Sequence, residues 1–322
     1  MKNLTGKAVG WIACRLSRLL HPVRFKHRSW GEDFPEKKFL VIRRRGYGMG
    51  LFSYFLTNLG WINYAFENGY VPVVDMKTYR SVYHHSKIKK KRENVWDLFF
   101  GQPAAFNLDD ISKAKNVTLI EEGALPDVPY FLPSLGKDEN IEIGNAAQLA
   151  KWRDLASKCV VPNTEALKNF VSSVFEDALS GGGVIGVLAR GTDYTRLRPK
   201  GHSVQPSVSD LFSAIEEYDA CCASAKPIFL VTEDHEIARM FFDRYGSRLI
   251  MSNQEFVSYK DGLLYRTDGI SGNLQRGFAY LKAIVDLSRC SVLIAGRTSG
   301  TVGAAVLSKG FSYSKVFSLG VY

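Results

Sequence analysis

Short apolar segments in the second half of the sequence, each followed by a stretch of helical periodicity, restrict most strongly what this chain can fold into. The clearest are Val184–Ala189, Ile228–Thr232, Arg248–Met251 and Ser291–Ala295. The first two show no alternation with polar residues, a pattern typical of strands buried on both faces of a parallel sheet. Strands that alternate with helices in this way predict a doubly wound α/β fold.

Helices are predicted between these strands. One begins at Ser207, and its apolar residues recur at helical spacing; longer ones cover 274–288 and 301–307, and a last strand covers 316–319. The glycine run at 180–183 precedes a strand and lacks the Gly-Lys-Ser/Thr ending of a P-loop, so we interpret it as a loop.

The first half of the sequence predicts a second α/β unit. Phe39–Arg43 and Tyr70–Val74 are apolar segments that suit strands, and a long apolar helix from Leu51 to Glu67 lies between them, with Gly69 as its terminator. Val117–Glu121 is a further predicted strand. A chain of 322 residues is long enough for two hydrophobic cores. We therefore expect two Rossmann-like domains, 1–160 and 161–322, with a cleft between them.

Polar residues that follow the predicted strands are candidates for binding, because ligands of open α/β sheets lie outside the carboxyl ends of the strands. Arg190, Thr192 and Asp193 follow the first strand of the second half. Arginine offers a planar fork that matches phosphate oxygens. Alone, this cluster is better explained as an ion pair between Arg190 and Asp193.

Two further clusters shift that balance. Thr232, Glu233 and Asp234 follow the next strand, and the turn Gly296–Gly300 leads from a strand directly into a helix. Backbone N–H groups at a helix start, together with hydroxyls and an arginine, can bind phosphate; the simpler role for Thr298 or Ser299 is to cap that helix. Three polar clusters at three strand ends predict one common site.

These segments resemble the motifs of the fucosyltransferase superfamily. Gly186–Asp193 is similar to the first motif, Phe229–Asp234 to the second and Gly296–Val302 to the third. The glycine loop, Arg45–Gly50, is similar to the family's N-terminal loop that faces both substrates; its members are Arg45, Gly46, Tyr47, Gly48, Met49 and Gly50. Order and spacing agree across most of the chain. Leu188 stands where the first motif usually has histidine, and the glycine loop carries no carboxylate.

The resemblance implies an inverting, metal-independent transferase of the GT-B arrangement that needs no cofactor and uses GDP-fucose as its substrate. The C-terminal half would bind this donor and the N-terminal half a glycan acceptor. By position, Arg190 would bind the β-phosphate, and Thr298 and Ser299 the diphosphate. The cluster Thr232–Asp234 would lie near the nucleotide.

Such a transfer develops charge on the departing diphosphate, which Arg190, Arg297 and the helix start would stabilise. The acceptor hydroxyl needs a base. Asp193 is the first candidate, His202 the second and Glu233 the third. Packing without chemistry is the simpler role for any single histidine, including His202.

Two other functions are compatible with parts of the sequence. The glycines of Gly46–Gly50 with Asp75 imitate a dinucleotide fingerprint, which would indicate an NAD(P)-dependent oxidoreductase, but this reading leaves the three C-terminal clusters unexplained. A non-catalytic nucleotide- or glycan-binding protein on the same scaffold is the other alternative.

The composition indicates which kinds of binding partner suit this chain. The net charge of +10 favours an anionic partner. Basic residues cluster at 43–45, 87–92 and 190–200, and a solvated face is the simpler interpretation of 87–92. These clusters lack the interleaved aromatics of a nucleic-acid groove. The five cysteines are irregularly spaced, which indicates reduced thiols and no metal site. The apolar run in residues 1–24 is interrupted by Arg15 and Arg18 and is too short to span a bilayer, and these residues are too charged to do so. They suit a basic amphipathic helix, on a membrane or on the protein's own core. We expect a cytoplasmic protein, peripheral on the inner membrane face if that helix binds lipid. The resemblance suggests a surface polysaccharide or lipid-linked oligosaccharide as acceptor.

Overall fold

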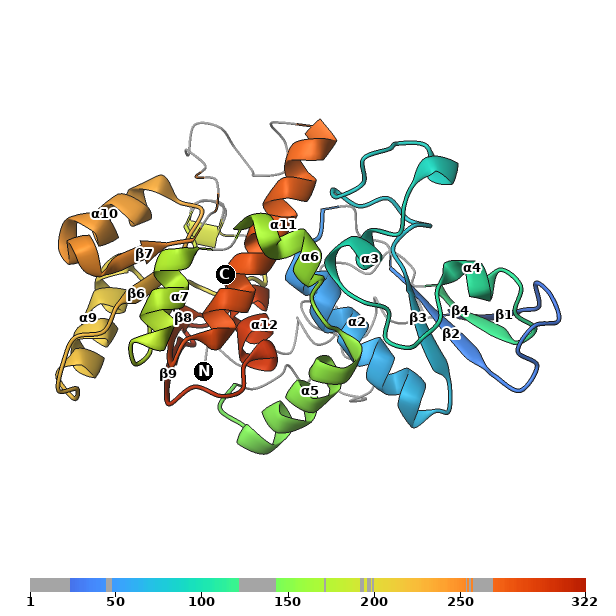
Figure 1. Ribbon diagram of the computed structural model, residues 1–322, viewed down its shortest axis with the longest axis horizontal. Helices are drawn as coiled ribbons and strands as arrows, with labels where there is room; N and C mark the ends of the chain where they lie inside the picture. The colour runs from blue at the N-terminus through green and yellow to red at the C-terminus, as the bar shows by residue number, and fades with distance from the viewer. Residues whose placement is uncertain are drawn as a thin grey trace, which may run out of the picture. The chain divides into compact units, whose positions relative to one another are not determined.

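The computed structural model describes residues 24–44, 48–121, 143–170, 172–191, 200–252 and 269–322, with 194, 195, 198, 254 and 256 (Figure 1). The predicted amphipathic N-terminal segment lies almost wholly outside this range. The described chain forms two compact units: one holds the residues up to 121 with 158–160, and the other holds 143–157 and the residues from 161 on. Residues 143–157, which we had predicted in the first domain, therefore pack with the second.

The first unit is built on a four-stranded mixed sheet with the order β1-β4-β2-β3. Strands β2, β3 and β4 are parallel, and β1 pairs antiparallel with β4 at the edge. Strand β1 was not predicted. The bounds are β1 Arg24–Arg28, β2 Phe39–Arg43, β3 Val71–Asp75, β4 Val117–Glu121, α2 Leu51–Glu67, η1 Lys89–Lys91, α3 Val95–Phe99 and α4 Leu108–Ile111.

Helix α2 has the predicted bounds, and its sequence explains both ends. Gly50 is its N-cap and offers no side chain to the first turn, so backbone N–H groups at the start of α2 receive no side-chain cap. At the other end, Asn68 Nδ2 donates to Tyr64 O, and Gly69 adopts a left-handed φ of 70°, the conformation in which a helix commonly ends. Helix α2 begins directly after Gly50, the last residue of the glycine loop.

The second unit contains a five-stranded sheet, β7-β6-β5-β8-β9, in which every pair is parallel. This confirms the predicted doubly wound sheet. The bounds are α5 Ala146–Cys159, α6 Thr164–Leu167, η3 Lys168–Phe170, α7 Ser173–Ser180, β5 Ile185–Leu188, α9 Val208–Asp219, β6 Ile228–Val231, α10 His235–Tyr245, η4 Gly246–Arg248, β7 Leu249–Met251, α11 Gly269–Arg289, β8 Val292–Gly296, α12 Ser299–Leu307 and β9 Tyr313–Phe317.

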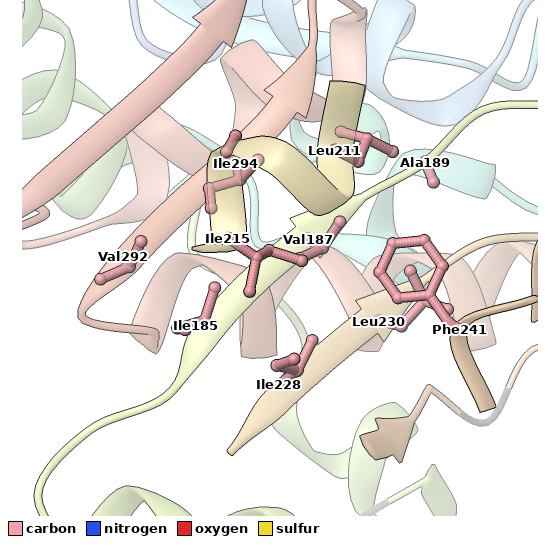
Figure 2. Close-up of a cluster of buried hydrophobic side chains, with 11 residues drawn as sticks. Ile185, Val187, Ala189, Leu211, Ile215, Ile228, Leu230, Phe241, Val292 and Ile294 are labelled. Atoms are coloured by element: carbon pink, nitrogen blue, oxygen red, sulfur yellow. The ribbon is translucent and has the colours of Figure 1, made fainter. Parts of the chain in front are cut away.

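Helices cover both faces of this sheet. Figure 2 shows Leu211 and Ile215 of α9 and Phe241 of α10 against Val187 and Leu230, all fully or almost fully buried. The alternate residues of the strands face the other way: the ring of Phe229 packs 4.5 Å from that of Phe175 in α7, and Gly186 lies beneath Leu287 of α11. A Cβ at Gly186 would lie 2.6 Å from Leu287, so glycine allows this close approach of helix and strand.

Candidate functional site

The strand order of the second unit brings the three predicted clusters to one edge. Strand β5 lies between β6 and β8, with Leu188 opposite both Val231 and Ala295. The chain reverses its direction across the sheet between β5 and β8, and this switch point is where open α/β sheets bind ligands. The segments that begin at Arg190, Thr232 and Arg297 therefore leave the sheet side by side.

Arg190 is held by the neighbouring strand's carboxylate. Its Nη1 donates to Glu233 Oε2 at 3.0 Å, and the two side chains are only 14% and 6% exposed. The sequence had suggested Asp193 as the partner that orients Arg190, but Thr192 and Asp193 lie outside the described residues. The contact with Glu233 could not be predicted without knowing that β5 and β6 are neighbours.

An aromatic side chain that we did not predict lies under the same arginine. Arg190 Cζ is 5.2 Å from the ring centroid of Tyr194, within the range of a cation–π contact. The ring of His202 meets that of Tyr194 edge-on, with centroids 5.4 Å apart. The sequence carried one signal for this contact, namely an aromatic residue four positions after the motif arginine. The structure thus brings His202 close to Arg190 through an intervening ring.

Two predicted donor contacts, Thr232 and Asp234, make hydrogen bonds within their own turn. Thr232 is fully buried, and its hydroxyl accepts from the N–H of Asp234 at 3.2 Å. Asp234 caps α10 by accepting from the backbone N–H groups of Glu236 and Ile237. A Cβ at Gly191 would lie 2.1 Å from the carboxylate of Asp234. These residues shape the edge of the site by fixing where β6 turns into α10.

The turn between β8 and α12 combines a helix start with an arginine. Thr298 is the N-cap of α12: its hydroxyl accepts from Thr301 N at 3.1 Å, as the simpler interpretation predicted. Arg297 and Ser299 are half-buried, and the side chain of Gln205 donates to the carbonyl of Arg297 at 3.3 Å. Gly300 follows as the second residue of the helix, so its N–H belongs to the positive end of α12. This end can bind an anion.

The glycine loop belongs to the first unit, and only Gly48, Met49 and Gly50 of it are described; Arg45, Gly46 and Tyr47 lie outside the described residues. Arg44 donates to the carbonyl of Ser53 and to the hydroxyl of Thr57, which ties the chain before the loop to the first turns of α2. Among the described residues outside its immediate chain neighbours, no atom lies within 4 Å of the place that a Cβ at Gly48 would take.

Asp75, the carboxylate required by the dinucleotide reading, is already engaged. It is 3% exposed, forms a 2.7 Å ion pair with Arg43 and accepts from the backbone N–H groups of Lys77 and Thr78 and from the Thr78 hydroxyl. A carboxylate with four such bonds has little capacity left for a ribose hydroxyl. This geometry disfavours the oxidoreductase alternative.

The described part of the chain contains neither a cluster of metal-binding side chains nor a membrane-spanning helix. Within it, no group of three or more histidine, cysteine, aspartate or glutamate side chains is arranged to hold a metal ion. None of the helices in the described ranges is long and apolar enough to cross a membrane.

Comparison with known proteins places the fold. Neither a protein-family model nor a curated protein sequence matches this chain. Two solved structures of NodZ alpha-1,6-fucosyltransferase, one soaked with GDP-fucose and one co-crystallized with GDP, match with a TM-score of 0.50 and 17% identity, over 84% of this chain and 93% of the other. A variant of Arabidopsis thaliana FUT1 in complex with GDP matches with a TM-score of 0.48 and 14% identity, over 86% of this chain and 69% of that chain. The two NodZ matches show that the chain has a fucosyltransferase-like α/β fold of the GT-B type.

Proposed function

We propose that this protein is a glycosyltransferase that moves a sugar from a nucleoside diphosphate, with GDP-fucose as the preferred donor, to a glycan acceptor. The observation that carries the proposal is the edge formed by β5, β6 and β8. There the segments that carry Arg190 and Arg297 follow the neighbouring strands β5 and β8, and α12 begins at Ser299, beside the switch point of a parallel sheet. Structures with the same fold were crystallised with GDP and GDP-fucose, which supports a nucleotide sugar as ligand.

In the proposed reaction, the bond between the sugar's anomeric carbon and the diphosphate oxygen breaks, and the acceptor oxygen bonds to that carbon from the opposite face. The diphosphate leaves with the bonding electrons. Its growing charge is stabilised by the guanidinium groups of Arg190 and Arg297, the Ser299 hydroxyl and the first N–H groups of α12. These groups let us propose an inverting transfer that does not require a metal ion.

The acceptor hydroxyl loses its proton to a base in this scheme. Glu233 is a poor candidate because its carboxylate is buried and binds Arg190. We therefore propose Asp193, which comes three residues after Arg190 in the sequence. Thr232 and Asp234 act indirectly, since their hydrogen bonds hold the turn that carries Glu233.

The acceptor we propose is a surface polysaccharide or lipid-linked oligosaccharide, assembled by a cytoplasmic enzyme that touches the inner membrane face. Supporting this, the turn Lys87–Lys91 is exposed and basic, and it includes Ile88, which is 58% exposed. Lysines around a projecting apolar side chain suit an anionic lipid surface. The basic segment 1–23 would add to this contact.

The proposal is tested by a thermal-shift screen against GDP, GDP-fucose, UDP, UDP-sugars and NADH, because a ligand of the folded state raises Tm by mass action. We expect GDP and GDP-fucose to raise Tm and Arg190→Ala to abolish that increase. Arg239→Ala is the matched control, since Arg239 forms a 2.9 Å ion pair with a glutamate of the same domain but is 61% exposed on α10. Stabilisation by NADH alone would contradict the proposal.

A second candidate, a nucleotide-binding protein without catalysis, is favoured by one observation: Leu188 occupies the place where the resembling motif has histidine. Hydrolysis of GDP-fucose separates the two functions, because transferases commonly leak donor to water. Binding of GDP-fucose with neither hydrolysis nor transfer to any acceptor would support the second candidate.

A further inference from the structure

The aromatic contacts beneath Arg190 have no role in the reaction as proposed so far. Tyr194 receives the guanidinium of Arg190 at 5.2 Å, and the His202 ring packs edge-on against Tyr194 at an interplanar angle of 62°. Glu233 holds Nη1 of the same arginine. Arg190 is therefore fixed from two directions, by a carboxylate on a neighbouring strand and by a ring that another ring supports.

The segment that carries His202 is held by backbone hydrogen bonds to the last residues of the sequence. Tyr322 N donates to His202 O at 3.0 Å, Gly201 N donates to Tyr322 O at 3.0 Å, and Val204 N donates to Gly320 O at 2.9 Å. Ser203 and Val321 form the antiparallel bridge between the two strands of this clasp, which we define as residues 201–204 paired with residues 320–322. The histidine is thus held through its backbone as well as through its ring.

The clasp also reaches the second arginine of the site. Gln205, the next residue, donates to the carbonyl of Arg297 and to that of Ser203. Its side chain packs against Gly296, where a Cβ would lie 2.2 Å from Gln205 Oε1. One continuous segment therefore contacts the surroundings of both Arg190 and Arg297.

We propose that Tyr194 and His202 are a positioning pair that holds the plane of the Arg190 guanidinium toward the diphosphate. The clasp keeps this pair at a fixed position relative to Arg297. The inference rests on the proposed function and deepens it. It assigns His202 a role through the face and edge of its ring, and not through proton transfer. The ligand recognised at this site is a pyrophosphate group.

Four variants distinguish packing from proton chemistry. Tyr194→Phe and His202→Phe keep an aromatic ring at each place, whereas Tyr194→Leu and His202→Ala remove it. We expect the two phenylalanine variants to keep kcat/KM for the donor within about threefold of wild type, and Tyr194→Leu and His202→Ala to lose about tenfold, the size of a partly buried cation–π contact. The KM for the acceptor and the Tm should change little in all four.

Pyrophosphate binding, measured by calorimetry, tests the pair without requiring turnover. We expect Tyr194→Leu to weaken pyrophosphate binding about tenfold and Tyr194→Phe to leave it unchanged. Removing the clasp by a stop after Leu319 should weaken it by a similar factor. Tyr322→Pro, which deletes one backbone donor of the clasp, should weaken it in part, and Tyr322→Ala, which keeps that donor, should not.

The failures of the two proposals are distinguishable. A wild-type protein that binds pyrophosphate but no nucleotide sugar contradicts the proposed function and leaves the pair supported. Tyr194→Leu that binds pyrophosphate as tightly as wild type overturns the pair alone. If His202→Phe loses transfer as completely as His202→Ala while both bind pyrophosphate normally, His202 acts through its imidazole nitrogens and our assignment is wrong. Absence of pyrophosphate binding by the wild type overturns both.

Discussion

Replacing Arg190 should affect stability and activity through different parts of the same contact. The guanidinium of Arg190 is the partner of a Glu233 carboxylate that is only 6% exposed. Arg190→Ala leaves this carboxylate buried and without that partner. Breaking a buried ion pair from one side costs about 3 kcal/mol. For a domain of this size that corresponds to a fall in Tm of roughly 6–12 °C.

A double variant separates the effect on stability from the effect on activity. In the double variant Arg190→Met and Glu233→Gln, neither side chain is charged, and methionine replaces much of the arginine's apolar stem. Pairs replaced in this way by uncharged residues are often as stable as the original, so we expect Tm to return to within a few degrees of wild type. Transfer should stay at least about a hundredfold below wild type in both variants, because one lost contact to the developing charge costs ~3 kcal/mol.

The assay combines thermal and urea denaturation with donor turnover on the wild type, Arg190→Ala and the double variant. If the double variant regained near-normal turnover, the defect of Arg190→Ala would lie in the uncompensated carboxylate. Arg190 would then not be a phosphate contact. If Arg190→Ala unfolded at the same urea concentration as wild type, the buried ion pair would not have the stabilising role that its geometry indicates.

Three further predictions concern the packing, charge and surface of the described chain. Gly191→Ala should destabilise the fold by about 1–3 kcal/mol in urea denaturation, because its Cβ would meet Asp234 at 2.1 Å, whereas Gly48→Ala, which meets no atom within 4 Å, should be neutral. The carboxylate of Glu176 accepts two hydrogen bonds from an arginine of α11, which lowers its pKa from the ordinary 4.5. The stability that Glu176 gains from its lowered pKa is present above the unfolded-state pKa and is lost as pH falls through the folded-state pKa. Glu176→Gln should therefore have a slightly lower Tm than wild type at pH 7 and the same Tm as wild type at about pH 2. A Tm difference that persists in acid would refute this linkage. Glutamine at all three positions of Lys89–Lys91 should weaken co-sedimentation with phosphatidylserine vesicles roughly a hundredfold, at about 1 kcal/mol per lysine, and unchanged binding would exclude the turn as a lipid contact.

The sequence predicted the second sheet because its strands are buried on both faces. Ile228–Val231 and Val292–Gly296 were each found within a residue or so of the expected bounds, since continuous aliphatic segments leave little choice of structure. Strand β9 was predicted at 316–319, so its predicted start is three residues later than the observed start at Tyr313. It is an edge strand with exposed positions at Ser314 and Lys315, so its apolar signal is weak.

Strand β1 was missed for a related reason. Arg24–Arg28 contains one apolar residue, Phe25, which is 43% exposed. It is a strand because β4, almost a hundred residues away, supplies hydrogen-bonding partners along one side. Pairing over that distance leaves no trace in local composition.

The sequence predicted that three polar segments follow neighbouring strands, but it did not predict the contacts that these residues make. The rule that ligands lie beyond the carboxyl ends of parallel strands identified the three segments without any structure. The contact between Arg190 and Glu233 depends on β5 and β6 being neighbours. The contact of Gln205 with the carbonyl of Arg297 joins residues 92 positions apart. Spatial neighbours of this kind depend on topology, which local patterns do not encode.

The strand order also has a consequence for biosynthesis. Strands β5, β6 and β7 with α9 and α10 are consecutive in the chain, so this part of the sheet can assemble while the ribosome is still synthesising the rest. Strand β8 is translated roughly a hundred residues after β5 and must insert beside it, a contact of high sequence separation. The edge to which we assign nucleotide binding would consequently be complete only at this late docking step, and capture of nucleotide by a nascent chain would report that β8 has joined the sheet.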